Sequence, residues 1–198
     1  MSRDRFAGSS RAIAAQDSTG HVGRAKGFLG VGGDAGRAAS MPFPLEVGAA
    51  EAGHVALAVG AAGVVTLARV TLLARWPEFK EATDISNRQV LTPLQGVDLL
   101  QVSAFPALGE ELLFRGTLLP AVGADWRGVT VAGIVFGALH ISGGRNPAFA
   151  VWSGSVGILY GALAVVTNDL YAPILAHTIA NLASATIWQA ENLLKENS

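Results

Sequence analysis

Three charged side chains lie close together in a part of the sequence that is otherwise apolar. Residues 109–116 read GEELLFRG and contain Glu110, Glu111 and Arg115. A charge in the middle of a lipid bilayer costs about 2.5 kcal/mol or more, so charged residues in membrane segments usually face the protein interior and have a function. A glutamate in such a position has the chemistry of a general base.

The spacing of these residues on a helix predicts different roles for the two glutamates. Glu111 and Arg115 are four positions apart, where a carboxylate meets a guanidinium, whereas Glu110 lies about 100° to one side. We therefore expect Arg115 to pair with Glu111 and to leave the carboxylate of Glu110 free. A free carboxylate in a poorly solvated site can act as a general base near neutral pH. The alternative is a buried structural ion pair with Glu110 at an interface.

Two further apolar runs contain polar side chains of catalytic type. His140 stands at the end of the run 128–141, one helical turn after Phe136. His177 and Asn181 lie four residues apart in the run 172–188, so a helix places them on the same face. A single buried histidine is more often a hydrogen-bonded core residue than a ligand. Together with the glutamates, however, the two histidines indicate one site built from three helices.

The composition favours a membrane protein. Of 198 residues, 51% are hydrophobic and 15% are charged, whereas soluble domains have about 25% charged residues. The net charge of -1 and the lack of a basic run give no indication of a nucleic-acid partner. The absence of cysteine excludes disulfides, thiolate metal sites and a cysteine nucleophile.

The apolar runs predict an all-α fold, a polytopic transmembrane bundle of four or five helices. The expected helices cover residues 48–76, 97–119, 128–141, 148–166 and 172–188. The first run is long enough to span a bilayer only if Arg69 snorkels or faces other helices. In the second run Pro106 predicts a kink, or a helix start with Ser103 as the cap. Gly154, Gly157 and Gly161 have the spacing of close helix packing.

The ends of the chain and one connection are polar. Residues 1–47 are predicted to be disordered, and their Arg, Ser and Ala content resembles an organelle transit peptide, the alternative being a low-complexity tail without a targeting role. The membrane bundle is expected over 48–190 and a polar tail over 191–198. Residues 77–95 should form an aqueous loop with a short amphipathic helix. A transit peptide would direct the protein to a chloroplast membrane; otherwise an endomembrane is expected.

In chain order, the polar residues of the three runs form three short signatures. They are EExxxR at Glu110, Glu111 and Arg115, FxxxH at Phe136 and His140, and HxxxN at His177 and Asn181. This pattern resembles the CAAX prenyl protease and bacteriocin-processing family of intramembrane endopeptidases, also called the CPBP or Abi family. The resemblance covers residues 91–188.

The resemblance implies an endopeptidase that acts on a membrane-associated substrate, such as a prenylated CAAX protein, in contact with membrane lipid. It implies that Glu110 activates water with the help of His140. His177 and Asn181 would stabilise the oxyanion that forms after attack on the carbonyl group. Arg115, paired with Glu111, would fix the geometry of the site.

Other interpretations of the same residues stay open. Glu110, His140 and His177 also form a plausible zinc set with an open fourth position, although no HExxH motif is present and a metal-free mechanism is favoured. A serine mechanism through Ser153 or Ser155 is weaker, because helix packing explains both. A non-proteolytic membrane scaffold that binds a protein or lipid partner is the alternative function, and a small transporter component is a third. His54 is explained by a polar interface.

Overall fold

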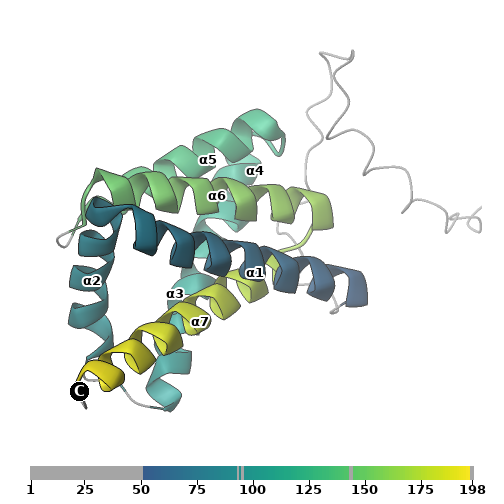
Figure 1. The fold of residues 1–198 in the computed structure, drawn as a ribbon. Helices are drawn as coiled ribbons and strands as arrows, with labels where there is room; N and C mark the ends of the chain where they lie inside the picture. Colours follow the sequence, from purple (N-terminus) through teal and green to yellow (C-terminus); the bar gives the residue numbers. More distant parts are fainter. Residues whose placement is uncertain (1–50, 93, 95, 143–144, 197–198) are drawn as a thin grey trace, which may run out of the picture. The chain divides into compact units, whose positions relative to one another are not determined.

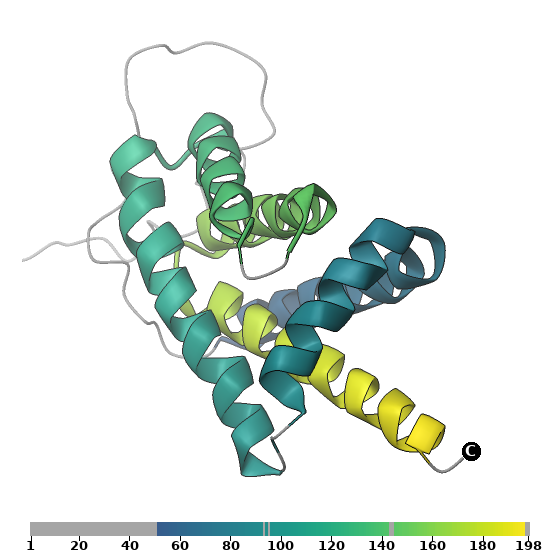
Figure 2. The same ribbon diagram turned by 90° about the vertical axis from the view of Figure 1, so that its left-hand side faces the viewer.

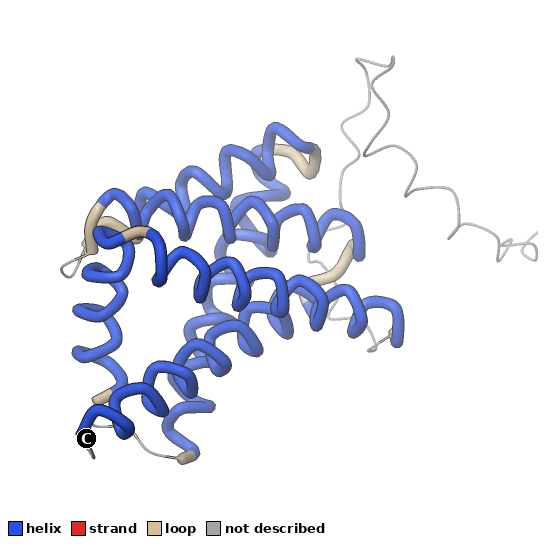
Figure 3. The backbone as a smooth tube through the Cα atoms, in the orientation of Figure 1, coloured by secondary structure: helices blue, strands red, loops and turns tan. Residues whose placement is uncertain are grey.

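A computed structural model gives the structure of residues 51–92, 94, 96–142 and 145–196. The segment 1–47, for which disorder and transit-peptide character are predicted, lies outside these residues. Every regular element in the described part of the chain is a helix, which confirms the predicted all-α class (Figure 3).

The helices follow the predicted apolar runs closely. In chain order they are α1 (Ala52–Arg75), α2 (Pro77–Leu91), α3 (Val97–Leu113), the π-helix η2 (Phe114–Leu118), α4 (Leu119–Val122), α5 (Trp126–Leu139), α6 (Pro147–Thr167) and α7 (Tyr171–Glu196) (Figure 1). The amphipathic helix expected between residues 77 and 95 is α2. The last helix extends well beyond Trp188, so most of the segment expected as a polar tail is helical.

Helix α7 is the element around which the others are arranged. It packs along α1 and along α3, and it also contacts α6 and α2. In Figure 2, α7 starts beside α3, passes the lower end of α2 and ends beyond it. Helices α5 and α6 form the most extensive pair in the bundle. The residues predicted to be catalytic lie on α3, on η2, directly after α5 and on α7, and α6 contacts η2, α5 and α7.

Two helices among the described residues are long and apolar enough to cross a membrane. They are α1, with 24 residues, and α6, with 21 residues. Helix α5 is apolar but has only 14 residues. Several large apolar side chains on α1 and α5 are exposed, among them Val64, Leu67 and Ile134. These features are consistent with the predicted helical membrane bundle.

The alternative that this helix begins at Pro106 is wrong, because α3 begins at Val97 and contains Pro106 in its interior. Ser103 is not a cap: its hydroxyl donates to the carbonyl oxygen of Leu99 at 2.7 Å, within the helix. The irregularity comes later, where the amide of Leu119 bonds to the carbonyl of Phe114, five residues back. Such π-turns are frequently found at functional sites.

Glycines bring α5 and α6 into backbone contact. A Cβ atom added to Gly137 would lie 2.5 Å from the carbonyl oxygen of Ala150 and 2.9 Å from the Cα of Gly154. One added to Gly133 would lie 2.4 Å from a side-chain atom of Ile158. Real side chains cannot approach so closely, so only glycine fits at these two positions. The predicted packing role of Gly154 is confirmed, and the close contact fixes the position of the C-terminal end of α5.

A polar contact joins the start of α1 to the turn before α7. The imidazole of His54 contacts the carboxylate of Asp169, and the other oxygen of this carboxylate accepts a hydrogen bond from the amide of Ala172 at 3.0 Å. Asp169 therefore holds the first turn of α7 and the N-terminal end of α1 together.

Candidate active site

The glutamates on α3 occupy different environments. Glu111 is fully buried, and one terminal nitrogen of Arg115 donates a hydrogen bond to its Oε1 atom at 2.8 Å. The ion pair expected from the sequence is therefore present. The side chain of Glu110 is 32% exposed and makes no contact shorter than 3.8 Å with a charged group in the described residues. The difference follows from the angle of about 100° between neighbouring residues on a helix.

Arg115 connects the EExxxR segment to two other helices. Its second terminal nitrogen donates to the carbonyl oxygen of Gly157 on α6 at 2.7 Å. Its guanidinium carbon lies 5.0 Å from the ring centre of Phe136 on α5, a distance typical of cation–π contacts. These contacts compensate the buried charge in part and prevent the Arg115 side chain from moving. Phe136 thus helps to hold Arg115 in addition to its place beside His140.

His177 on α7 contacts both glutamates. Its Nδ1 atom lies 2.8 Å from Oε1 of Glu111, and its Nε2 atom lies 3.8 Å from Oε2 of Glu110. An ionised carboxylate only accepts hydrogen bonds, so the hydrogen in the shorter contact belongs to Nδ1. In a neutral ring, Nε2 then presents its lone pair towards Glu110. The buried pair of Glu111 and Arg115 therefore fixes both the orientation and the tautomer of His177.

A hydrogen bond also fixes the orientation of the His140 ring. Its Nδ1 atom lies 2.6 Å from the backbone carbonyl oxygen of Phe136, which can only accept a hydrogen bond. Its Nε2 atom consequently carries the lone pair of the neutral ring and lies 4.0 Å from Oε1 of Glu110. Although the sequence predicts a helix over 128–141, His140 is the C-cap residue that follows α5.

Each carboxylate oxygen of Glu110 therefore faces an imidazole Nε2 atom from a different helix. Both separations are too long for a direct hydrogen bond, and distances of this kind suit a bridging water molecule. A cavity of about 270 Å³ adjoins this carboxylate. Its wall includes Glu110, Phe136, Tyr160, His140, His177 and Asn181. The three predicted signatures thus contribute to one cavity, with Glu111 and Arg115 behind its wall.

Asn181 lies one turn after His177 on the cavity side of α7. Its amide nitrogen is 3.4 Å from the carbonyl oxygen of Ser103 on α3, a long contact that holds it weakly. The amide is therefore available to donate a hydrogen bond to a ligand. The shared face predicted for His177 and Asn181 is present in the structure.

Two cavity residues were missed by the sequence analysis. The hydroxyl oxygen of Tyr160 on α6 is buried without a hydrogen-bond partner in the described residues, and its ring centre lies 5.1 Å from that of His177. Arg145, just before α6, donates two hydrogen bonds to the hydroxyl of Ser86 on α2, at 3.0 and 3.2 Å. In the sequence, a tyrosine between glycines in an apolar run and an arginine in a loop are only weak indications of a functional site. Their places depend on packing between distant helices.

The serines of α6 do not form a catalytic pair with histidine. Ser155 is exposed and donates to the carbonyl oxygen of Val151 at 2.8 Å, within its own helix. Ser153 lines the cavity, but the structure records no hydrogen bond between it and His177 in the described part of the chain. A serine nucleophile requires contact with its base.

Zinc binding is the alternative interpretation of Glu110, His140 and His177. Among the described residues, no group of three His, Asp or Glu side chains has the arrangement of a metal site. The Nε2 atoms of His140 and His177 do face Glu110, and both Nδ1 atoms are hydrogen-bonded, as in many zinc ligands. However, ligand atoms around a tetrahedral zinc ion lie about 3.3 Å apart, compared with the 3.8 and 4.0 Å found here. In this arrangement the carboxylate oxygens of Glu110 and the two Nε2 atoms therefore lie farther apart than the ligands of a bound zinc ion.

The segment that carries these residues matches a known protein family. The family described as type II CAAX prenyl endopeptidase Rce1-like matches residues 92–183, a segment that contains all three signatures. This part of the chain therefore belongs to the CAAX prenyl endopeptidase family, as the resemblance implied. Helices α1 and α2 lie outside the matched segment. No curated protein and no solved structure matches the chain.

Proposed function

We propose that this protein is an intramembrane endopeptidase that hydrolyses a peptide bond near the C-terminus of a prenylated, CAAX-type protein. The observation that carries the proposal is the position of Glu110, whose two carboxylate oxygens lie 4.0 and 3.8 Å from the Nε2 atoms of His140 and His177. These three side chains come from three helices and border the same cavity. Membership of the matched segment in a CAAX endopeptidase family supports the choice of substrate.

In the proposed mechanism Glu110 is the general base. A water molecule between its carboxylate and Nε2 of His140 gives a proton to Glu110 as its oxygen attacks the scissile carbonyl carbon. The tetrahedral intermediate then collapses, the C–N bond breaks, and the proton passes from Glu110 to the leaving nitrogen. His140 accepts a hydrogen bond from the water through its lone pair and so orients it.

The oxyanion requires hydrogen-bond donors on the opposite side of the substrate. The amide of Asn181 can donate in any charge state, whereas Nε2 of His177 donates only when both ring nitrogens carry hydrogen. Each donor of this kind contributes about 3–4 kcal/mol to transition-state stabilisation. Glu111 and Arg115 do not touch the substrate in this scheme. They position His177 through the 2.8 Å contact with its Nδ1 atom.

The substrate and the lipid would both reach the protein within the membrane. The exposed apolar side chains of α1 and α5 suit contact with lipid tails. A prenyl chain is a hydrocarbon like these tails. The membrane itself, a chloroplast membrane or an endomembrane, remains a prediction from the N-terminal sequence.

The test is cleavage of a farnesylated CAAX peptide by the purified full-length chain in lipid nanodiscs. We expect Glu110→Gln to lower kcat by about a thousandfold or more, because an amide cannot accept the proton. Glu81→Gln, on the exposed side of α2, is the matched control and should retain the wild-type rate. A metal chelator should leave the wild-type rate unchanged. If the wild type binds the peptide without cleaving it, the scaffold function replaces this proposal.

A further inference from the structure

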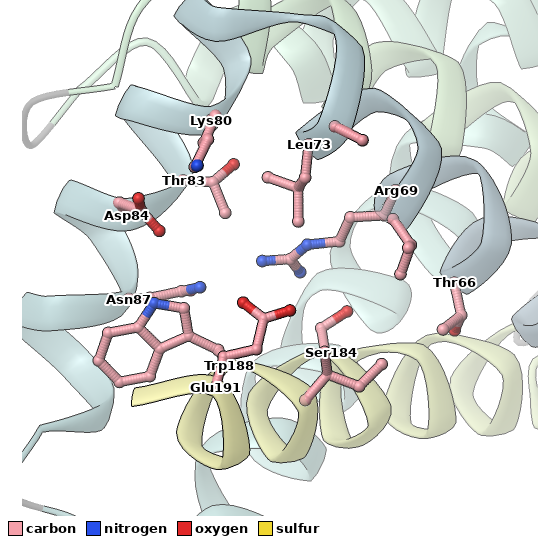
Figure 4. Close-up of a pocket in the computed structure, with 13 residues that line it drawn as sticks. Thr66, Arg69, Leu73, Lys80, Thr83, Asp84, Asn87, Ser184, Trp188 and Glu191 are labelled. Atoms are coloured by element: carbon pink, nitrogen blue, oxygen red, sulfur yellow. The ribbon is translucent and has the colours of Figure 1, made fainter. Parts of the chain in front are cut away.

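Arg69 is a partly buried charge in the last third of α1, a helix that is long and apolar enough to cross a membrane. It lies on α1, six residues before the end of the helix, and interrupts a long apolar run. Such a charge is rarely retained unless it faces a polar interior. Figure 4 shows its guanidinium group extending into the space between α1, α2 and α7. The family model does not include α1, so it gives no role to this residue.

The space around Arg69 is a second cavity that adjoins the catalytic one. It has a volume of about 260 Å³, and its wall includes Lys80, Asp84 and Glu191. Arg69 also lines the cavity that contains Glu110, His140 and His177. Asn87 and Ser184 are likewise shared by both cavities. Arg69 therefore stands where the two spaces meet.

The guanidinium group of Arg69 is available for an anion. No ion pair within 4.0 Å joins it to any side chain that the structure describes, although Asp84 and Glu191 line the same space. The other arginine of the catalytic cavity, Arg145, already gives two of its N–H groups to Ser86. A planar guanidinium binds a carboxylate through two parallel hydrogen bonds, which makes a carboxylate its natural ligand.

We infer that Arg69 binds the C-terminal α-carboxylate of the substrate and thereby selects proteins that end close to the scissile bond. The inference rests on the proposed peptidase function. A CAAX motif places the prenylated cysteine three residues before the free carboxylate, and three extended residues span roughly 10 Å. The carboxylate must then lie away from Glu110 but at the wall of the same cavity, as Arg69 does.

The experiment compares two farnesylated CAAX peptides, one with a free C-terminal carboxylate and one with a C-terminal amide. The wild-type chain in nanodiscs should cleave the free acid with a kcat/KM about 10–100-fold higher than the amide, as expected for loss of a charge-assisted hydrogen-bond pair. In Arg69→Gln this ratio should fall to about one, because only the acid is cleaved more slowly. Unchanged cleavage of the amide peptide shows that the variant is folded.

Two arginine variants serve as controls. Arg75→Gln changes an exposed arginine at the end of the same helix and should keep the wild-type ratio. Arg145→Gln changes the other arginine of the cavity and should also keep it. The inference is overturned if the wild type does not prefer the acid, if Arg69→Gln keeps the preference or slows both peptides equally, or if Arg145→Gln alone abolishes it.

Failure of the peptidase function would be visible separately. If the wild type cleaves neither peptide, binding of each fluorescent peptide to the wild type and to Arg69→Gln is measured by anisotropy. Tighter binding of the acid by the wild type, lost in Arg69→Gln, supports the carboxylate site in a protein that does not cleave. Equal binding of acid and amide by the wild type overturns it.

Discussion

Replacing Arg115 by methionine should strongly destabilise the bundle. The change removes the 2.8 Å hydrogen bond to Glu111 and the 2.7 Å hydrogen bond to Gly157. It also leaves the carboxylate of Glu111, which is fully buried, without its cation. Breaking a buried ion pair from one side costs about 3–5 kcal/mol, because the remaining charge stays desolvated. In a domain of this size, that corresponds to a fall in Tm of about 6–20 °C.

The assay is thermal unfolding of the purified protein in detergent, followed by intrinsic tryptophan fluorescence. Arg75→Met is the control, since the exposed Arg75 side chain makes no ion pair in the described residues and its loss should shift Tm by less than about 2 °C. The double change Glu111→Gln with Arg115→Met should be more stable than Arg115→Met alone, because it leaves no isolated charge. A Tm for Arg115→Met within about 2 °C of the wild type would refute the reasoning.

Two further predictions concern α6 and its neighbours. Gly137→Val should destabilise the protein by about 3 kcal/mol or more, because a Cβ atom there would lie 2.5 Å from a backbone oxygen of α6. The control is Gly63→Ala on α1, where a Cβ atom would meet nothing within 4 Å, and it should not destabilise the protein. Equal Tm values for the two variants would contradict the close packing of α5 against α6. Tyr160→Phe should raise the free energy of unfolding by about 1 kcal/mol in the same assay, since the hydroxyl is buried without a partner in the described residues. A lower stability would mean that the hydroxyl is hydrogen-bonded in solution.

The local features of the site could be predicted from the sequence because they depend on positions within one helix. The pair of Glu111 and Arg115 needs only the four-residue spacing of an α-helix. The same holds for the shared face of His177 and Asn181. The packing role of Gly154 was also predictable, because small residues at regular spacing have few other uses in an apolar helix.

The conformation of Pro106 was not predictable by the same rules. The sequence allowed a helix start at Pro106, but α3 starts nine residues earlier, at Val97. Packing of α3 along α7 supplies the stability that the missing hydrogen bond removes. The irregular turn instead falls in η2, which contains Gly116 and is followed by Pro120.

The pattern of residues was enough to predict a helical and apolar protein, a glutamate paired with Arg115, and three apolar segments with acidic, imidazole and amide groups. The folded structure was needed to show that His177 bonds to Glu111, that Glu110 lies between two imidazoles, and that Arg69 borders the same space. These relations join residues that are far apart in the chain. They depend on how each helix is rotated and how closely it packs, and a pattern within one helix does not contain that information.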